Sequence, residues 1–168
     1  MVHWAAVGLS GRKWGRMPLT GTYLRAIDEK RRLAIPKRLR EDFGEGNVEH
    51  LYIAPGTEKS LLLYAPRAFA ALAERLRDRT NHLNANQINY LRLFYSSAER
   101  VDLDAQGRIR IPDRLADLVG LGHEAYLLGV HDHAEIWDKD RWDSFSSQLV
   151  TDFDQLAYQA YRGPEYPS

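Results

Sequence analysis

The chain has 168 residues, and its composition of 44% hydrophobic and 27% charged residues is typical of one globular domain. It contains no cysteine, which excludes disulfides, thiol nucleophiles and thiolate zinc sites. It also has no apolar run long enough to cross a bilayer, so we expect a soluble, cytoplasmic protein with no membrane partner.

The formal net charge is zero, but the charges are unevenly distributed. Residues 1–40 hold ten Lys and Arg against two acidic residues, a formal charge of +8, and the remaining chain therefore carries −8. An asymmetry of this size suggests a polyanionic partner, although solvated charge commonly explains a single basic cluster. Residues 1–20 combine basic residues and glycines without a sustained hydrophobic period, which predicts a flexible basic arm.

The first half of the chain reads as strand, turn, strand and helix. From Gly21, hydrophobic and polar residues alternate into a turn at Asp28 and out of it to Ile35, which predicts a β-hairpin. Pro36 then begins a short helix, because its fixed φ suits the first helical turn. A second strand pair with a Pro-Gly turn is expected over residues 51–64.

Two helices, within about residues 66–100, are expected to join the halves. Their apolar residues recur at i, i+3 and i+7, the spacing of an amphipathic helix, and core packing is the ordinary explanation. These residues are Phe69, Leu72 and Leu76 in the first helix and Ile88, Leu91 and Tyr95 in the second.

The second half repeats the order of the first. A strand over residues 101–103 leads into the turn DAQG, and a second strand follows it, with isoleucines on one face and arginines on the other. A helix then begins at Pro112 and ends at Gly120, a natural C-terminal cap. Another strand pair is expected over residues 125–138.

Residues 143–168 are expected to form a long amphipathic helix and a tail. The apolar residues recur every three or four positions, so they share one helical face. They are Trp142, Phe145, Leu149, Phe153, Leu156 and Ala160. Core packing explains such a face, but a helix beyond the repeat could also dock on a neighbouring subunit.

The two halves share a motif. The stretch DEKRRLAIP at residues 28–36 reappears as DAQGRIRIP at residues 104–112, 76 positions later. The pattern predicts an α+β fold, mainly β with flanking helices, in which residues 21–142 form one domain. Its two repeats span about residues 21–70 and 97–142 and are pseudo-symmetric hairpin-helix-hairpin halves.

The turn of each motif brings an aspartate and an arginine together. Asp28 and Asp104 can accept hydrogen bonds from backbone N–H groups about two residues ahead, and Gly107 can adopt the positive φ that closes the turn. Arg32 and Arg108 stand four residues beyond each aspartate, within its reach across a tight turn. The aspartates and Gly107 therefore brace the turns, and bracing could also be all that the pairs do.

For the arginines we favour a function. Guanidinium groups at a hairpin tip can reach phosphate oxygens and guanine edges, and a two-stranded ribbon fits the DNA major groove. The candidate DNA-binding residues are Lys30, Arg31, Arg32, Arg108 and Arg110.

The doubled D-x-x-x-R with Ile-Pro after each copy, the basic helix after the first copy, and a later E-I-W and Trp resemble the MraZ family of bacterial transcriptional regulators. The resemblance covers about residues 21–142. The chain is also similar, more distantly, to AbrB-like swapped-hairpin proteins. The resemblance implies that the halves interlock into one swapped-hairpin β-barrel, and that protomers assemble into a ring.

The resemblance also implies a function. A nucleoid-associated ring would bind direct repeats in double-stranded DNA upstream of the division and cell-wall gene cluster, through both turns. One position departs from the family pattern, because Arg31 stands where the turn usually has glycine and where the second copy has Gly107. We therefore expect the first turn to adopt a different geometry.

Two other classes of function stay open. If HDHAE is a strand, His131, His133 and Glu135 share a face and could hold a metal ion, although a loop with incidental histidines is the simpler interpretation. An oligomeric protein-interaction or antitoxin-like module could have the same fold. No arrangement of residues supports catalysis, so we expect no enzyme, no cofactor, no metal and no small-molecule substrate.

Overall fold

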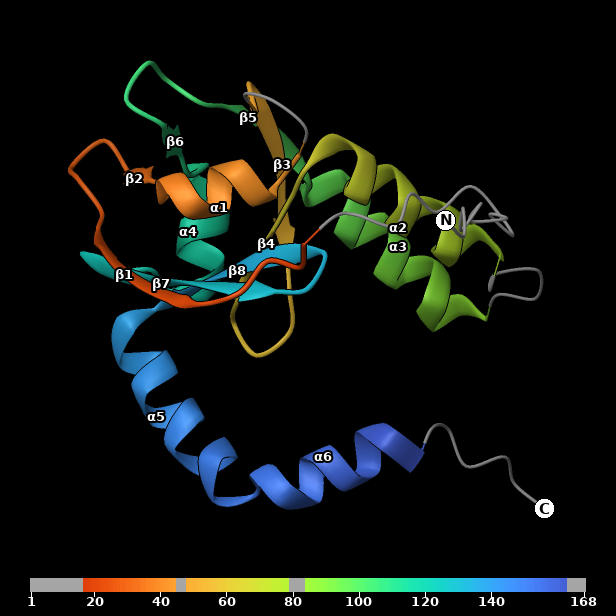
Figure 1. The fold of residues 1–168 in the computed structure, drawn as a ribbon. Helices are drawn as coiled ribbons and strands as arrows, with labels where there is room; N and C mark the ends of the chain where they lie inside the picture. The colour runs from red at the N-terminus through yellow and green to blue at the C-terminus, as the bar shows by residue number, and fades with distance from the viewer. Residues whose placement is uncertain (1–16, 45–47, 79–83, 163–168) are drawn as a thin grey trace, which may run out of the picture.

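The computed structural model of the chain describes residues 17–44, 48–78 and 84–162, and Figure 1 shows its fold. The strands are β1 (Thr22–Ala26), β2 (Arg32–Ala34), β3 (His50–Pro55), β4 (Leu61–Tyr64), β5 (Glu99–Asp102), β6 (Arg108–Arg110), β7 (Glu124–Val130) and β8 (His133–Asp138). The helices are α1 (Lys37–Asp42), α2 (Pro66–Asp78), α3 (Ala85–Ser97), α4 (Asp113–Val119), α5 (Lys139–Thr151) and α6 (Phe153–Arg162). The expected α+β class is confirmed.

The strand order has the symmetry of the repeat. A six-stranded antiparallel sheet runs β1-β7-β8-β4-β3-β5, and exchanging the two halves of the chain reproduces this order in reverse. Strand β1 of the first half pairs with β7 of the second, and β5 of the second half pairs with β3 of the first. Each half therefore completes its sheet with a strand from the other half.

Strands β2 and β6 form a separate two-stranded ribbon. Arg32 lies opposite Arg110, Leu33 opposite Ile109, and Ala34 opposite Arg108. The hairpins expected at each motif form only next to the turns, where Ile27 bridges Leu33 and Asp104 N–H donates to the Arg108 carbonyl. Beyond the turns the expectation is wrong, because the strand that leaves each turn pairs with its counterpart in the other half. Among the described residues the six-stranded sheet does not close into the expected barrel.

The core contains equivalent side chains from both halves. Positions 76 residues apart are buried together, which follows from the shared hydrophobic pattern. These pairs are Leu33 and Ile109, Ile35 and Ile111, Leu39 and Leu115, and Leu51 and Leu127. Because the halves supply one core, we expect them to fold together.

Both short helices begin where the sequence predicts, and α4 also ends where predicted. Pro36 and Pro112 stand directly before α1 and α4, where a missing N–H leaves no intrahelical bond unmade. Gly120 ends α4 in the left-handed conformation, at φ 65°. The two helices thus follow the ribbon strands directly and lie close behind the two turns (Figure 1).

Helices α2 and α3 pack beside β3 and β4 through aromatic side chains (Figure 1). Phe69 of α2 stacks on Tyr52 of β3 with ring centroids 4.8 Å apart, and also contacts Tyr64 of β4. Phe94 of α3, which is 2% exposed, packs on Phe69 in turn. Phe69 of the expected apolar stripe of α2 therefore contacts the sheet.

The C-terminal segment forms two helices, so the expectation of one long helix is wrong. Helix α5 ends at Thr151, and Asp152 leaves helical geometry at φ −101° and ψ 12°. Asp154 lies in the first turn of α6, where the helix dipole favours negative charge. Trp137 of β8 packs on Trp142 and Phe145 of α5 and anchors this helix to the sheet.

Pairing with the second half also involves a residue before Gly21. Leu19, which we assigned to the arm, is 5% exposed and pairs with His131 through two backbone hydrogen bonds. A Cβ atom at Gly129 would lie 2.3 Å from the backbone nitrogen of Thr20, so only glycine permits this close approach. Residues 1–16 of the arm lie outside the described residues. Within the described ranges, no helix has the length and apolar character needed to span a membrane.

Candidate nucleic-acid interface

The first turn, residues 28–32, is organised around one carboxylate. Asp28 Oδ1 accepts hydrogen bonds from the backbone N–H groups of Lys30, at 3.0 Å, and of Arg32, at 2.8 Å. Asp28 Oδ2 accepts a hydrogen bond from Arg32 Nε at 2.6 Å. No hydrogen bond joins the Nη atoms of Arg32 to another described residue, so they stay available to a ligand.

The second turn, residues 104–108, has the same geometry. Asp104 Oδ1 accepts from the backbone N–H groups of Gln106 and Arg108, each at 2.9 Å, and Asp104 Oδ2 accepts from Arg108 Nε at 2.8 Å. Each aspartate thus accepts three hydrogen bonds within its own turn, and that it braces the turn stays a prediction. The sequence pattern D-x-x-x-R fixes one arrangement of side chain and backbone twice.

Both carboxylates are held in the ionised form. The Arg32 backbone N–H lowers the pKa of Asp28 most strongly, burial opposes this, and the Arg32 side chain lowers the pKa further. The same causes, with Arg108 in place of Arg32, lower the pKa of Asp104. The two ion pairs therefore persist well below neutral pH.

The two turns project from the same end of the molecule, between β1 and β2 and between β5 and β6 (Figure 1). They flank the β2–β6 ribbon, whose inward residues Leu33 and Ile109 are fully buried. Side chains alternate in direction along a strand, so Arg32, Arg108 and Arg110 share the outward face. Their side chains are 36%, 29% and 69% exposed.

The spacing of these guanidinium groups follows from the register. Arg108 lies opposite Ala34, two residues beyond Arg32, so the two arginines are offset by about 7 Å along the ribbon at a rise near 3.4 Å per residue. Arg32 and Arg110 lie directly opposite each other, where like charges are unfavourable. A polyanion on this face would relieve that repulsion.

Arg31 adopts the conformation that glycine has in the second turn. Its φ is 58° and that of Gly107 is 74°, so the expected difference in turn geometry is wrong. The Arg31 side chain, a candidate DNA contact, lies on α4, where Nη2 donates to Asp117 Oδ1 at 2.7 Å. Its Nε lies 3.4 Å from Asp113 Oδ1.

Lys30 keeps an exposed position at the tip of the first turn. No described side chain forms an ion pair or hydrogen bond with its amine.

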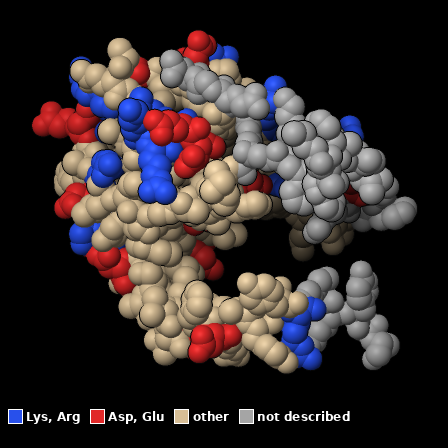
Figure 2. All heavy atoms as spheres, in the orientation of Figure 1, with Lys and Arg blue, Asp and Glu red and all other residues tan. Residues whose placement is uncertain are grey.

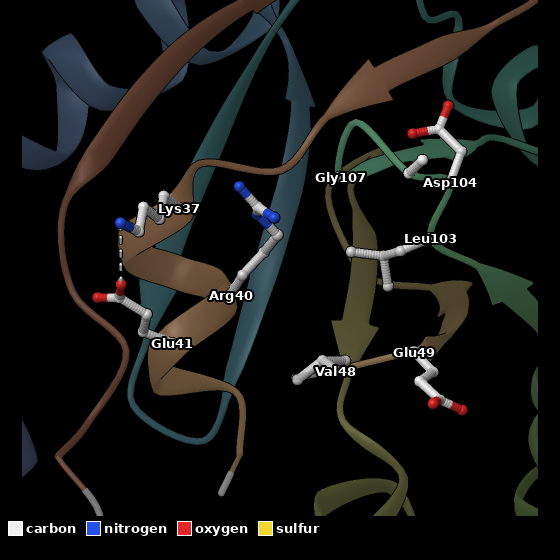
Figure 3. A pocket seen from close by; sticks show the side chains of 9 residues that line it. Lys37, Arg40, Glu41, Val48, Glu49, Leu103, Asp104 and Gly107 are labelled. Carbon is white, nitrogen blue, oxygen red and sulfur yellow. Dashed lines mark ion pairs between the residues drawn. The ribbon is translucent and has the colours of Figure 1, made fainter. Parts of the chain in front are cut away.

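A groove of about 550 Å³ lies beside the second turn (Figure 3). Lys37 and Arg40 of α1 line one side, and Val48, Leu103 and Asp104 line the other. A Cβ atom on Gly107 would lie 2.7 Å from the Arg40 guanidinium carbon, so this arginine packs over the glycine. Sequence reasoning did not single out Arg40, although the basic run 37–40 was a visible signal.

Charges of both signs are interspersed over the end of the molecule that carries β1, β2 and α1, whereas the surface of α5 and α6 in this view is mainly uncharged (Figure 2). Asp28, Asp104, Asp113 and Asp117 contribute negative charge close to the arginines. This surface therefore carries separate guanidinium groups with carboxylates between them, and it is not a uniform basic patch.

Comparison with known proteins identifies the family. The family model described as "MraZ protein, putative antitoxin-like" matches residues 19–89 and 94–160, one match for each half of the chain. The chain belongs to the MraZ family. Curated MraZ relatives are named "Transcriptional regulator MraZ". One from Limosilactobacillus fermentum is 36% identical over 82% of this chain and 92% of the relative. One from Bifidobacterium longum is 34% identical over 83% and 89%.

The MraZ relatives are named as regulators and not as enzymes, which agrees with the expectation that this chain is no enzyme. The resemblance drawn from the doubled motif is therefore confirmed. The description of the family model also names an antitoxin-like character, so the protein-interaction alternative keeps some support.

In this MraZ chain, His131, His133 and Glu135 do not have the arrangement that the metal hypothesis requires. His131 lies in the turn before β8 with φ 63°, so only His133 and Glu135 share a strand face. Within residues 17–44, 48–78 and 84–162, no three His, Cys, Asp or Glu side chains are grouped so that they could hold a metal ion.

His133 instead lies between two carboxylates. Its Nδ1 is 2.8 Å from Asp132 Oδ1 and its Nε2 is 3.5 Å from Glu135 Oε1. Arg75 of α2 donates to Asp132 Oδ2 at 3.1 Å, and Trp137 Nε1 donates to Glu135 Oε2 at 2.7 Å. The network connects α2 to the turn between β7 and β8.

This network predicts a dependence of stability on pH. Burial lowers the pKa of His133, but hydrogen bonds to Glu135 and Asp132 outweigh it and raise the pKa above its usual value. The stabilisation by His133 is thus complete below its unfolded-state pKa of about 6.5 and is lost as pH rises through the folded value. In the unchanged protein, the free energy of unfolding should decrease as pH rises above about 6.5. We expect His133→Gln to make this decrease smaller, as measured by urea titration at several pH values.

The matched control is His123→Gln, which changes an exposed histidine. The control should keep the alkaline fall of the unchanged protein. A His133→Gln variant that loses stability with rising pH as steeply as the unchanged protein contradicts the assignment.

Proposed function

We propose that the chain is a sequence-specific DNA-binding transcriptional regulator that contacts double-stranded DNA through both D-x-x-x-R turns. The observation that carries the proposal is the pair of equivalent turns on one ribbon, each with its arginine Nε bound by an aspartate and its arginine side chain partly exposed. Arginines held in this way lose little conformational entropy on binding and can donate to two acceptors at once.

The outward face of the β2–β6 ribbon enters the major groove in this proposal. A two-stranded ribbon fits a groove about 12 Å wide, and arginine is the commonest reader of guanine O6 and N7. Arg32 and Arg108 are the proposed base or phosphate contacts, and Lys30 and Arg110 are the proposed phosphate contacts. Arg31 lies behind this face, and its role is taken up below.

A ring of protomers is the proposed binding form. One protomer offers two turns, whereas several protomers facing direct repeats gain effective concentration without a new kind of contact. The exposed apolar side chains of α5 and α6 are a candidate surface between protomers; they are Val150, Phe153, Leu156, Tyr158 and Tyr161. The proposed target is the direct repeats upstream of the division and cell-wall gene cluster, which implies a place on the nucleoid.

Fluorescence anisotropy tests the proposal. The protein is titrated into labelled duplex from upstream of its own operon and, separately, into an unrelated duplex of equal length, at several salt concentrations. We expect binding to the upstream duplex to be at least about a thousandfold tighter, and to weaken with salt by about 0.9 log units per phosphate neutralised for each log unit of salt.

Equal affinity for both duplexes would reject sequence-specific binding. No binding to either would favour the second candidate, a protein-interaction or antitoxin-like module. The antitoxin-like description of the matching family is what favours this candidate.

A further inference from the structure

Arg31 occupies a backbone position that favours glycine. Its φ of 58° is in the left-handed region, and the equivalent position of the second turn is Gly107, at 74°. A side chain at such a position is unfavourable unless the surroundings hold it. The contacts of Arg31 therefore indicate what the arginine does.

These contacts run to the other half of the chain. The Arg31 guanidinium binds Asp117 at 2.7 Å and lies 3.4 Å from Asp113, and both carboxylates belong to α4. The Arg31 backbone carbonyl accepts a hydrogen bond from the Ile111 N–H at 2.9 Å. The first turn is thus held to the second half by both the backbone and the side chain of Arg31.

The second turn is held from the opposite direction. Arg40 of α1 packs over Gly107, and its Nε donates to the backbone carbonyl of Ile35 at 3.1 Å. Ile35 in turn donates its backbone N–H to the Gly107 carbonyl at 2.9 Å. Each turn therefore has one guanidinium between itself and the helix of the other half, supplied once by the turn and once by the helix.

We infer that Arg31 is a positioning residue that clamps the first D-x-x-x-R turn to α4 through Asp117, and that it does not itself contact DNA. This inference rests on the proposed function. Arg31 sets the direction in which Lys30 and Arg32 face the duplex, because the clamp fixes the residue between them.

Asp117→Asn distinguishes the two possible roles of Arg31, a clamp and a DNA contact. The two roles predict opposite changes in promoter affinity. If Arg31 were a phosphate contact that Asp117 partly neutralises, removing the negative charge of Asp117 would tighten promoter binding. The slope of log affinity against log salt concentration would then become steeper by about 0.9. A clamp predicts binding weakened by about three- to tenfold, with the salt slope unchanged.

Arg31→Gly gives a second test. It removes the guanidinium but suits the backbone, so the turn can still form. We expect Arg31→Gly to lose a similar amount of affinity for the promoter, while the slope of log affinity against log salt does not fall by about 0.9. The double variant Arg31→Gly with Asp117→Asn should bind no more weakly than the weaker-binding of the two single variants. Charge-matched controls on α2 are Asp78→Asn and Arg67→Ala.

Hydrogen exchange tests the clamp without DNA. In the free protein, Asp117→Asn should speed exchange of the backbone N–H groups of Lys30 and Arg32, while Gln106 and Arg108 of the second turn serve as internal controls. The charge-reversed double variant Arg31→Asp with Asp117→Arg should restore the protection of these N–H groups against hydrogen exchange. Unchanged exchange in the first turn, or tighter DNA binding by Asp117→Asn, would overturn the inference. Failure of the unchanged protein to bind DNA would reject only the proposed function.

Discussion

Replacing both Arg32 and Arg108 by alanine is expected to weaken promoter binding by about 2 to 6 kcal/mol per protomer, because each well-placed arginine contact contributes about 1–3 kcal/mol. The two guanidinium groups occupy equivalent places on one ribbon face, so each single variant should give about half of the loss. The salt dependence should also become shallower if either side chain neutralises a phosphate. Anisotropy titrations at several salt concentrations measure both quantities.

The control for the double variant is Arg67→Ala with Arg141→Ala, which removes the same charge from exposed positions on α2 and α5. It should bind the upstream duplex nearly as the unchanged protein does. Both double variants should keep the far-UV circular dichroism of the unchanged protein, since the backbone N–H groups of the turns still bind Asp28 and Asp104. Unimpaired binding by the Arg32 and Arg108 double variant would reject these residues as the interface.

The largest loss of stability is expected from Leu33→Ala. Leu33 is fully buried opposite Ile109 at the centre of the β2–β6 ribbon. Truncating a buried leucine typically costs about 2–5 kcal/mol, through lost apolar contact and the cavity left behind. Since the two halves share one core, we expect a single cooperative transition at lower denaturant, measured by urea unfolding.

The control for this change is Leu118→Ala on α4, where the side chain is 50% exposed. Its effect should stay below about 1 kcal/mol. Two separate transitions in Leu33→Ala, one for each half of the chain, would contradict the shared core.

Much of the local structure could be predicted from the sequence, because short-range chemistry determines it. The aspartate and arginine of each turn are four residues apart, and their hydrogen bonds depend only on that spacing. Pro112 and Gly120 mark the limits of α4 for equally local reasons. The prediction that Asp28 and Asp104 brace the turns required no knowledge of distant contacts.

The pairing of distant strands was harder to predict. Nothing within residues 21–35 shows that β1 pairs with β7 and that β2 pairs with β6. An alternating pattern gives the face of a strand but not its partner, so the local hairpin was the natural expectation. The repeated motif and the repeated order of elements are the sequence signals of the symmetry between the halves.

Arg31 illustrates a second limit. Its backbone conformation is unfavourable when only the turn is considered, and a different turn geometry was expected for that reason. Asp117 lies 86 positions further along the chain, so the contact that accompanies this conformation has no local signature. The same holds for Arg40, which reaches Gly107 in the other half.

Tethered DNA cleavage tests the central claim most directly. The chain has no cysteine, so single cysteines at Glu29 and Ala105, equivalent exposed positions in the two turns, can each carry an iron chelate that cleaves nearby DNA. Thr57→Cys, in the turn between β3 and β4 away from both motif turns in Figure 1, is the control. We predict cleavage of the upstream duplex from positions 29 and 105 and not from 57. Bound DNA cleaved only from position 57, or from none of the three, would contradict the account.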